Sequence, residues 1–136
     1  MGTIYVAKSK TLQAWGADVG LGKNTVYKIG YVEDGEPAAL LAAGLAGVSD
    51  WEVIKTQEAE GVTEDSLLER LARKEKLVDP NYYPKIKGAL GLVKIDLMKI
   101  ENSMRIRIAL ETNQEPKDIK VKPADIAQYL INNSLS

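Results

Sequence analysis

Clustered and alternating apolar positions mark four segments of the chain as strands. Thr3–Ser9 and Thr25–Val32 are rich in β-branched and aromatic residues, and Trp51–Ala59 alternates apolar with polar positions in its first half. Gly91–Asp96 has the same character over a shorter length. Because branched and aromatic side chains pack well on a pleated surface, these segments predict four strands.

A different periodicity predicts helices elsewhere. Ala and Leu, which favour helices, dominate Ala38–Ala46. Glu64–Leu77 follows Thr63, a good N-cap residue, and places its leucines on one side of a helix. A third segment alternates strictly over Met104–Leu110, which is also typical of a strand, but its length favours a helix. Pro123 opens the fourth segment. The predicted helices span Ala38–Ala46, Glu64–Leu77, Leu97–Thr112 and Ala124–Asn132.

The remaining segments predict loops and one short strand. Lys10–Asn24 contains three glycines, which predict a loop or a short turn of helix. Asn81–Leu90 predicts a loop in which Tyr82 and Tyr83 lie among lysines, a composition that can stack on nucleic-acid bases. Ile119–Lys122 predicts a short strand. Together the elements predict an α+β fold, with a small and mainly antiparallel sheet covered by helices.

The composition narrows the possible chemistry. The 136 residues include no cysteine and no histidine. Disulfides, thiolate metal sites and cysteine nucleophiles are therefore excluded, acid–base work falls to Tyr, Lys, Asp or Glu, and any metal would have oxygen ligands. No apolar run approaches the ~20 residues of a membrane span, and the first residues lack the pattern of a secretory signal. We expect a single cytoplasmic domain without a membrane partner.

Charge is unevenly distributed, although the net charge is only −1. Residues 1–66 carry 5 lysines and 10 acidic residues, whereas residues 67–136 carry 13 basic and 9 acidic residues. Such asymmetry is typical of a side that faces a polyanion, and equally of the solvated faces of ordinary helices. The residues predicted to contact such a polyanion are Lys28, Arg70, Arg73, Lys74, Lys85, Lys87 and Arg105.

The first two predicted strands carry the candidate chemistry. Tyr5 lies on the first strand and Tyr27 on the second, and tyrosines facing the same side of neighbouring strands would bring their hydroxyls together. A helix over that face would add a carboxylate, for which Glu69 is the best candidate. Tyrosine, carboxylate, a hard divalent ion and basic residues suffice to hydrolyse a phosphodiester without histidine or cysteine.

The order of these motifs resembles the GIY-YIG nuclease superfamily, particularly its phage- and bacteria-associated branch. Ile4-Tyr5-Val6 precedes Tyr27-Lys28-Ile29-Gly30, the form of the second motif that is common in that branch. A helix, a strand and a Leu-Leu-Glu-Arg helix follow, so that the resemblance covers about Thr3–Lys76. It implies a three-stranded antiparallel sheet flanked by helices, with a core at about residues 3–78 and a basic C-terminal extension at 79–136.

The resemblance also implies cleavage of DNA that depends on a divalent metal, Mg²⁺ or Mn²⁺. It makes Tyr5 and Tyr27 catalytic residues and Glu69 the metal ligand, with Glu64 or Glu75 in that role under a different register. The family places an arginine on the helix after the second motif, but residues 36–47 contain no Arg or Lys. Because such an arginine stabilises charge in the transition state, the alternative is a catalytically inactive module that binds DNA or protein.

Overall fold

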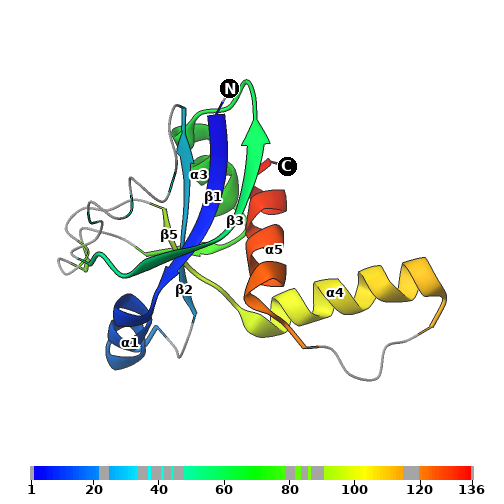
Figure 1. The fold of residues 1–136 in the computed structure, drawn as a ribbon. Coiled ribbons are helices and arrows are strands. Elements are labelled where there is room, and N and C mark those ends of the chain that lie inside the picture. The colour runs from blue at the N-terminus through cyan, green and yellow to red at the C-terminus, as the bar shows by residue number, and fades with distance from the viewer. Residues whose placement is uncertain are drawn as a thin grey trace.

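A five-stranded antiparallel sheet forms the centre of the protein (Figure 1). The computed structural model describes residues 2–21, 25–33, 37, 41, 44, 48–78, 82–83, 86, 91–114 and 120–135. The strand order is β3-β1-β2-β5-β4. The strands span Gly2–Ser9 (β1), Val26–Val32 (β2), Trp51–Ala59 (β3), Lys76–Leu77 (β4) and Leu92–Lys94 (β5).

The α+β class is confirmed, but the expectation of three strands is wrong. β3, β1 and β2 are the three strands that the resemblance implies; β5 confirms the fourth strand predicted over Gly91–Asp96, and β4 was not predicted. β5 pairs with residues 26–28 of β2, and β4 pairs with β5. This extension gives backbone partners to a part of β2 that would otherwise be an unpaired edge.

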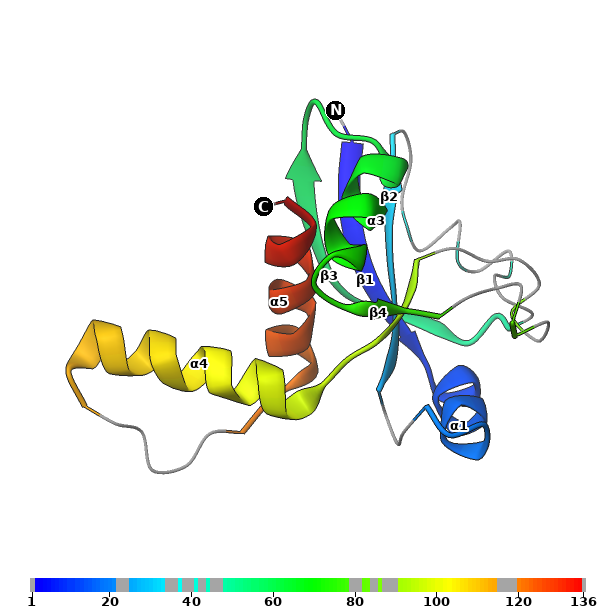
Figure 2. The same cartoon turned by 180° about the vertical axis from the view of Figure 1, so that it is seen from behind.

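Two helices cover the same face of the sheet. α3 (Glu64–Ala72) and α5 (Pro123–Leu135) lie side by side against it (Figures 1 and 2). Their apolar side chains close one core with β1, β2 and β5, and the residues from α5 are Ile126, Ala127, Leu130 and Ile131. The segment expected as a C-terminal extension therefore contributes a helix to the main core.

Side-chain caps determine where the helices begin. Ser9 and Asp96 accept hydrogen bonds from first-turn amides of α1 (Lys10–Asp18) and α4 (Leu97–Thr112). Thr63 and Ser66 form a reciprocal capping box at the start of α3. Because such caps satisfy amides that have no partner within the helix, each fixes the position of the first turn.

Several predicted elements are confirmed, and some differ. α4 has the predicted bounds, and α5 is longer than predicted. Of the two alternatives predicted for Lys10–Asn24, a loop or a short turn of helix, the structure has a helix at the start, α1, whose Leu12 is buried against the sheet. The helix predicted over Glu64–Leu77 ends at Ala72, since β4 follows it, and residues 120–122 form no strand. The predicted segments Ala38–Ala46 and Asn81–Leu90 lie largely outside the described residues.

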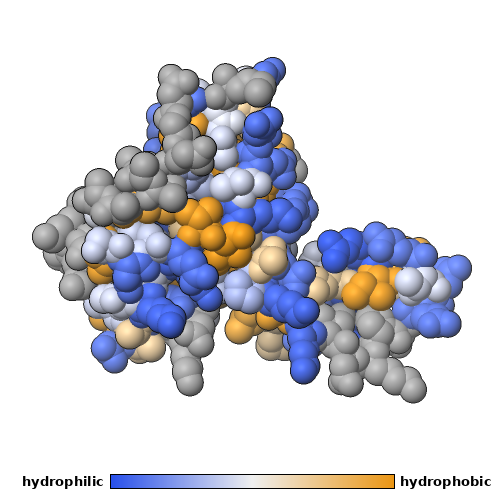
Figure 3. Space-filling view, in the orientation of Figure 1, coloured by the Kyte–Doolittle hydropathy of each residue, from blue (hydrophilic) through white to orange (hydrophobic). Residues whose placement is uncertain are grey.

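The C-terminal part of helix α4 projects from the body of the protein (Figures 1 and 3), whereas its first turns pack on the main core through Ile100 and Met104. Ile100 is its one buried residue, whereas Met98, Ile106 and Leu110 are 72%, 62% and 78% exposed. Across the part of the chain that the structure describes, no helix combines the length and the apolar content needed to cross a membrane.

Candidate functional site: Tyr5, Lys28 and Glu64

The register between β1 and β2 decides which side chains share a face of the sheet. Tyr5 is the partner of Gly30, and Ala7 is the partner of Lys28. Directly opposed residues of antiparallel strands point to the same side of a sheet. Tyr5, Lys28 and Gly30 therefore lie on one face, which we call the Tyr5 face.

Tyr27 lies on the opposite face, which we call the Tyr27 face. Its ring belongs to the apolar core beneath α3 and α5, whereas Tyr5 packs with Ala7 and Leu41 in a separate cluster. The expectation that the two tyrosine hydroxyls meet is therefore wrong. The physical reason is the two-residue period of a strand: Tyr27 stands three residues before Gly30, and an odd separation changes the face.

The ring of Tyr5 crosses over β2 at Gly30. A Cβ atom at position 30 would lie 2.5 Å from the hydroxyl oxygen of Tyr5 and 2.7 Å from its Cζ. A side chain there would collide with the ring, which accounts for the glycine. Tyr5 is 1% exposed, and burial, reinforced by the charge of Glu64, raises the pKa of its hydroxyl to about 12. Tyr5 therefore keeps its proton at neutral pH.

Lys28 places a buried positive charge beside this ring. Its Nζ lies 5.9 Å from the centroid of the Tyr5 ring, donates to the carbonyl oxygen of Ile29 at 3.1 Å, and lies 3.7 Å from Glu64 Oε1. Burial lowers the pKa of Lys28, and the nearby Glu64 partly restores it. The side chain of Lys28, which the sequence predicts as a DNA contact, is 4% exposed and faces Tyr5 and Glu64.

Glu64 completes the group from the first turn of α3. The capping box formed by Thr63 and Ser66 fixes this turn, and the positive end of the helix dipole favours a carboxylate there. The side chain of Glu64 is 43% exposed, so it forms the solvent-facing side of the group. Glu64 is thus the one of the three glutamates considered from the sequence that reaches Tyr5 and Lys28.

The other two glutamates point elsewhere. Glu69 is 71% exposed and pairs with Arg73 on its own helix at 3.2 Å. The leucines of α3 face the sheet and leave Glu69 in solvent, so the expectation that Glu69 joins the tyrosines is wrong. Glu75 is buried and pairs with Lys99 at 3.3 Å.

The predicted basic contacts are distributed over several elements. Arg70 and Lys74 lie at or just beyond the C-terminal end of α3, and Arg105 lies on α4. Arg73 and Arg105 are each paired with a glutamate one turn earlier in the chain, which reduces the charge that they present to a ligand. Lys85 and Lys87 lie outside the described residues.

A divalent ion would find one carboxylate in this group. In the described part of the chain, no three Asp, Glu, His or Cys side chains gather closely enough to hold a metal ion. Mg²⁺ commonly keeps several waters and uses one or two carboxylates together with phosphates of the substrate. Glu64 fits that mode of binding, because it is partly exposed and points away from the apolar core.

The sequence was sufficient to identify Lys28 as a residue on the same face as Gly30, but it was not sufficient to identify Glu64 as a residue close to Lys28. Lys28 stands two residues before Gly30, and the two-residue period of a strand places both on one face. The position of Glu64 depends on how α3 crosses the sheet, which no local pattern specifies.

In comparisons with protein-family models, curated proteins and solved structures, the chain has no significant match.

Proposed function

We propose that the protein is a GIY-YIG-like DNA endonuclease that depends on a divalent metal, with Tyr5, Lys28 and Glu64 as its active site. The observation that carries the proposal is the grouping of a phenol and an ammonium on one face of the sheet with a carboxylate that reaches the ammonium from the start of α3. The motif order supports it as well. Tyr27, Ile29 and Gly30 match the second motif, and Lys28 is the residue inserted between them in the related branch.

The three side chains would have different roles in hydrolysis. Glu64 would hold the Mg²⁺ or Mn²⁺ ion, which polarises the phosphodiester when bound. Tyr5, which keeps its proton, would donate a hydrogen bond to a phosphate oxygen. Lys28 would supply fixed positive charge next to the phosphate. This charge takes the place of the arginine that the family carries on the helix after the second motif.

The second candidate function is binding of DNA without cleavage. The burial of Tyr5 and Lys28, which are 1% and 3% exposed, favours it. The absence of Arg and Lys from residues 36–47 also favours it, because a phosphate would meet fewer cations than in an active member of the family. This module would bind DNA in a salt-sensitive way and leave the strands intact.

Nicking of supercoiled plasmid in the presence of Mg²⁺ or Mn²⁺ tests the proposed activity. We expect the wild-type protein to nick the plasmid, EDTA to stop the reaction, and Glu64→Gln to slow it by about a hundredfold or more. Glu69→Gln makes the same charge change on the same helix and is the matched control. It should nick at the wild-type rate, because Glu69 faces solvent away from the group.

Two outcomes would contradict the proposal. Plasmid that stays intact with every metal at high protein concentration would exclude the endonuclease and favour the binding module. Loss of nicking in Glu69→Gln together with full activity in Glu64→Gln would show that Glu69, and not Glu64, holds the metal. Circular dichroism of each variant checks that the fold is retained.

A further inference from the structure

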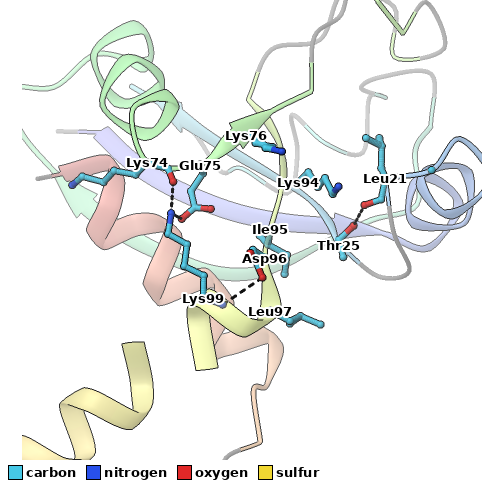
Figure 4. A pocket seen from close by; sticks show the side chains of 11 residues that line it. Leu21, Thr25, Lys74, Glu75, Lys76, Lys94, Ile95, Asp96, Leu97 and Lys99 are labelled. Carbon is cyan, nitrogen blue, oxygen red and sulfur yellow. Dashed lines mark hydrogen bonds and ion pairs between the residues drawn. The ribbon is translucent and has the colours of Figure 1, made fainter. Parts of the chain in front are cut away.

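Two lysines face each other across the last two strands of the sheet. Lys76 of β4 is the register partner of Lys94 of β5. Like charges directly opposite each other destabilise a strand pair. Within the described residues, neither ammonium forms an ion pair with a carboxylate. Figure 4 shows both side chains extending to the same side, toward Leu21. An anion bound between them would relieve the repulsion.

The two lysines also line two adjoining cavities. The cavities have volumes of 460 and 430 Å³ and share Gly20, Leu21, Lys76 and Lys94. Each volume is within the range of about 300–1,000 Å³ that is typical of ligand sites. The two cavities adjoin at these shared residues along the β4–β5 edge, and together we call them the lysine trough.

The carboxylates of the trough are already used by the protein itself. Glu75 is buried and pairs with Lys99, and Asp96 accepts hydrogen bonds from first-turn amides of α4. The backbone carbonyl oxygen of Lys74 accepts a hydrogen bond from Lys99 Nζ, while the side chain of Lys74 points away from the cavity (Figure 4). The charge that remains for a ligand is therefore that of Lys76 and Lys94.

Aromatic rings lie at the other end of the trough. Tyr82 and Tyr83 line the second cavity, and Tyr82 is 75% exposed. The ring centroids of Tyr82 and Tyr83 lie 4.8 Å apart, and those of Tyr83 and Trp15 lie 5.5 Å apart, both in an edge-on arrangement. This chain of contacts holds the Tyr82 ring in place while leaving it open to a planar ligand.

We propose that the lysine trough binds single-stranded nucleic acid. A phosphate lies between Lys76 and Lys94, and an unpaired base stacks on Tyr82. Cationic grooves with aromatic platforms bind single strands in this way, whereas the bases of a duplex are stacked on each other and cannot reach the ring. The inference goes beyond the proposed endonuclease and does not require hydrolysis, because the trough and the group at Tyr5 have no residue in common.

Fluorescence anisotropy with a labelled 15-residue oligo-dT, in EDTA, tests this binding. The double variant Lys76→Glu/Lys94→Glu should bind at least tenfold more weakly at 50 mM salt. The loss of two phosphate contacts should also reduce the slope of log K against log salt by about 1.4. Lys120→Glu/Lys122→Glu is the matched control. It makes the same charge change at exposed positions that line neither cavity, and it should stay close to the wild type.

The aromatic half of the site has a test of its own. Tyr82→Ala should weaken oligo-dT binding about fivefold or more, while Tyr82→Phe, which keeps the ring, should not. Binding of a hairpin duplex should be insensitive to both substitutions. Equal affinity of the Lys76→Glu/Lys94→Glu and control variants would overturn the proposal. So would an oligonucleotide that binds no more tightly than dTMP or pyrophosphate, which would assign the trough to a free nucleotide or phosphate. Because EDTA prevents hydrolysis, these results do not depend on the nicking assay.

Discussion

The two faces of the sheet come from the same two strands but have opposite chemistry. On the Tyr27 face, Ile4, Val6 and Ile29 are fully buried in an apolar core under two helices. On the Tyr5 face, the Nζ atom of Lys28 lies 5.9 Å from the centroid of the Tyr5 ring. The carboxylate of Glu64 reaches Lys28 from the start of α3. The difference teaches that the largest apolar core lies on one side of β1 and β2, whereas on the other side Tyr5 and Lys28 lie among smaller apolar clusters.

The largest difference between the faces should appear in stability. Ile29→Ala should lower the free energy of unfolding by about 2–5 kcal/mol, because it leaves a cavity in the core. At the adjacent position, Lys28→Met should change it by less than about 1.5 kcal/mol, since the apolar chain is kept and the partly exposed Glu64 can be rehydrated. Urea denaturation measures both values. Equal destabilisation by the two substitutions would mean that the Tyr5 face is as essential to the fold as the core.

An intermediate effect is expected where Tyr5 crosses β2. Gly30→Ala should destabilise the protein by about 1–3 kcal/mol, because the new methyl group would overlap the Tyr5 ring. In a Tyr5→Ala background the same substitution should cost clearly less. A double-mutant cycle from denaturation curves gives the coupling between the two positions. Additive costs would show that the ring does not lie over Gly30.

A smaller effect should appear at alkaline pH. The pKa of Tyr5 is about 12 in the folded protein and about 10 in an unfolded chain. The folded state therefore holds the proton longer, so the stabilisation is complete below pH 10 and is lost as the pH rises toward 12. Tyr5→Phe should show a shallower loss of stability across this range than the wild type, measured by denaturation at each pH. An unchanged slope would mean that Tyr5 is not buried.

The sequence was sufficient to predict most strands and helices, but not how all of the strands pair in the sheet. Strand and helix periodicity predicted β1, β2, β3 and α4 with bounds within one or two residues. β5 lies within Gly91–Asp96, which the sequence predicted as a strand. β4 is 2 residues long, too short to show a period, and its pairing depends on contacts between segments far apart in the chain. For this reason the fifth strand could not be derived from local patterns.

The candidate site was partly predictable for a related reason. Tyr5, which its motif singled out in the sequence, lies beside Lys28 in the structure. The choice of Tyr27 over Lys28 followed the residue type and ignored the two-residue period of the strand. The choice of Glu69 over Glu64 required the orientation of α3 over the sheet, which depends on packing of its leucines and not on any short motif.

The grouping of Tyr5 and Lys28 apart from Tyr27 is tested most directly by nuclear Overhauser contacts in the labelled protein. We predict cross-peaks from the Tyr5 ring protons to the Gly30 α-protons and to the Lys28 side chain, and from the Tyr27 ring to methyl groups of the core under α3. Cross-peaks that join the Tyr5 and Tyr27 rings, with none to Gly30, would contradict this arrangement.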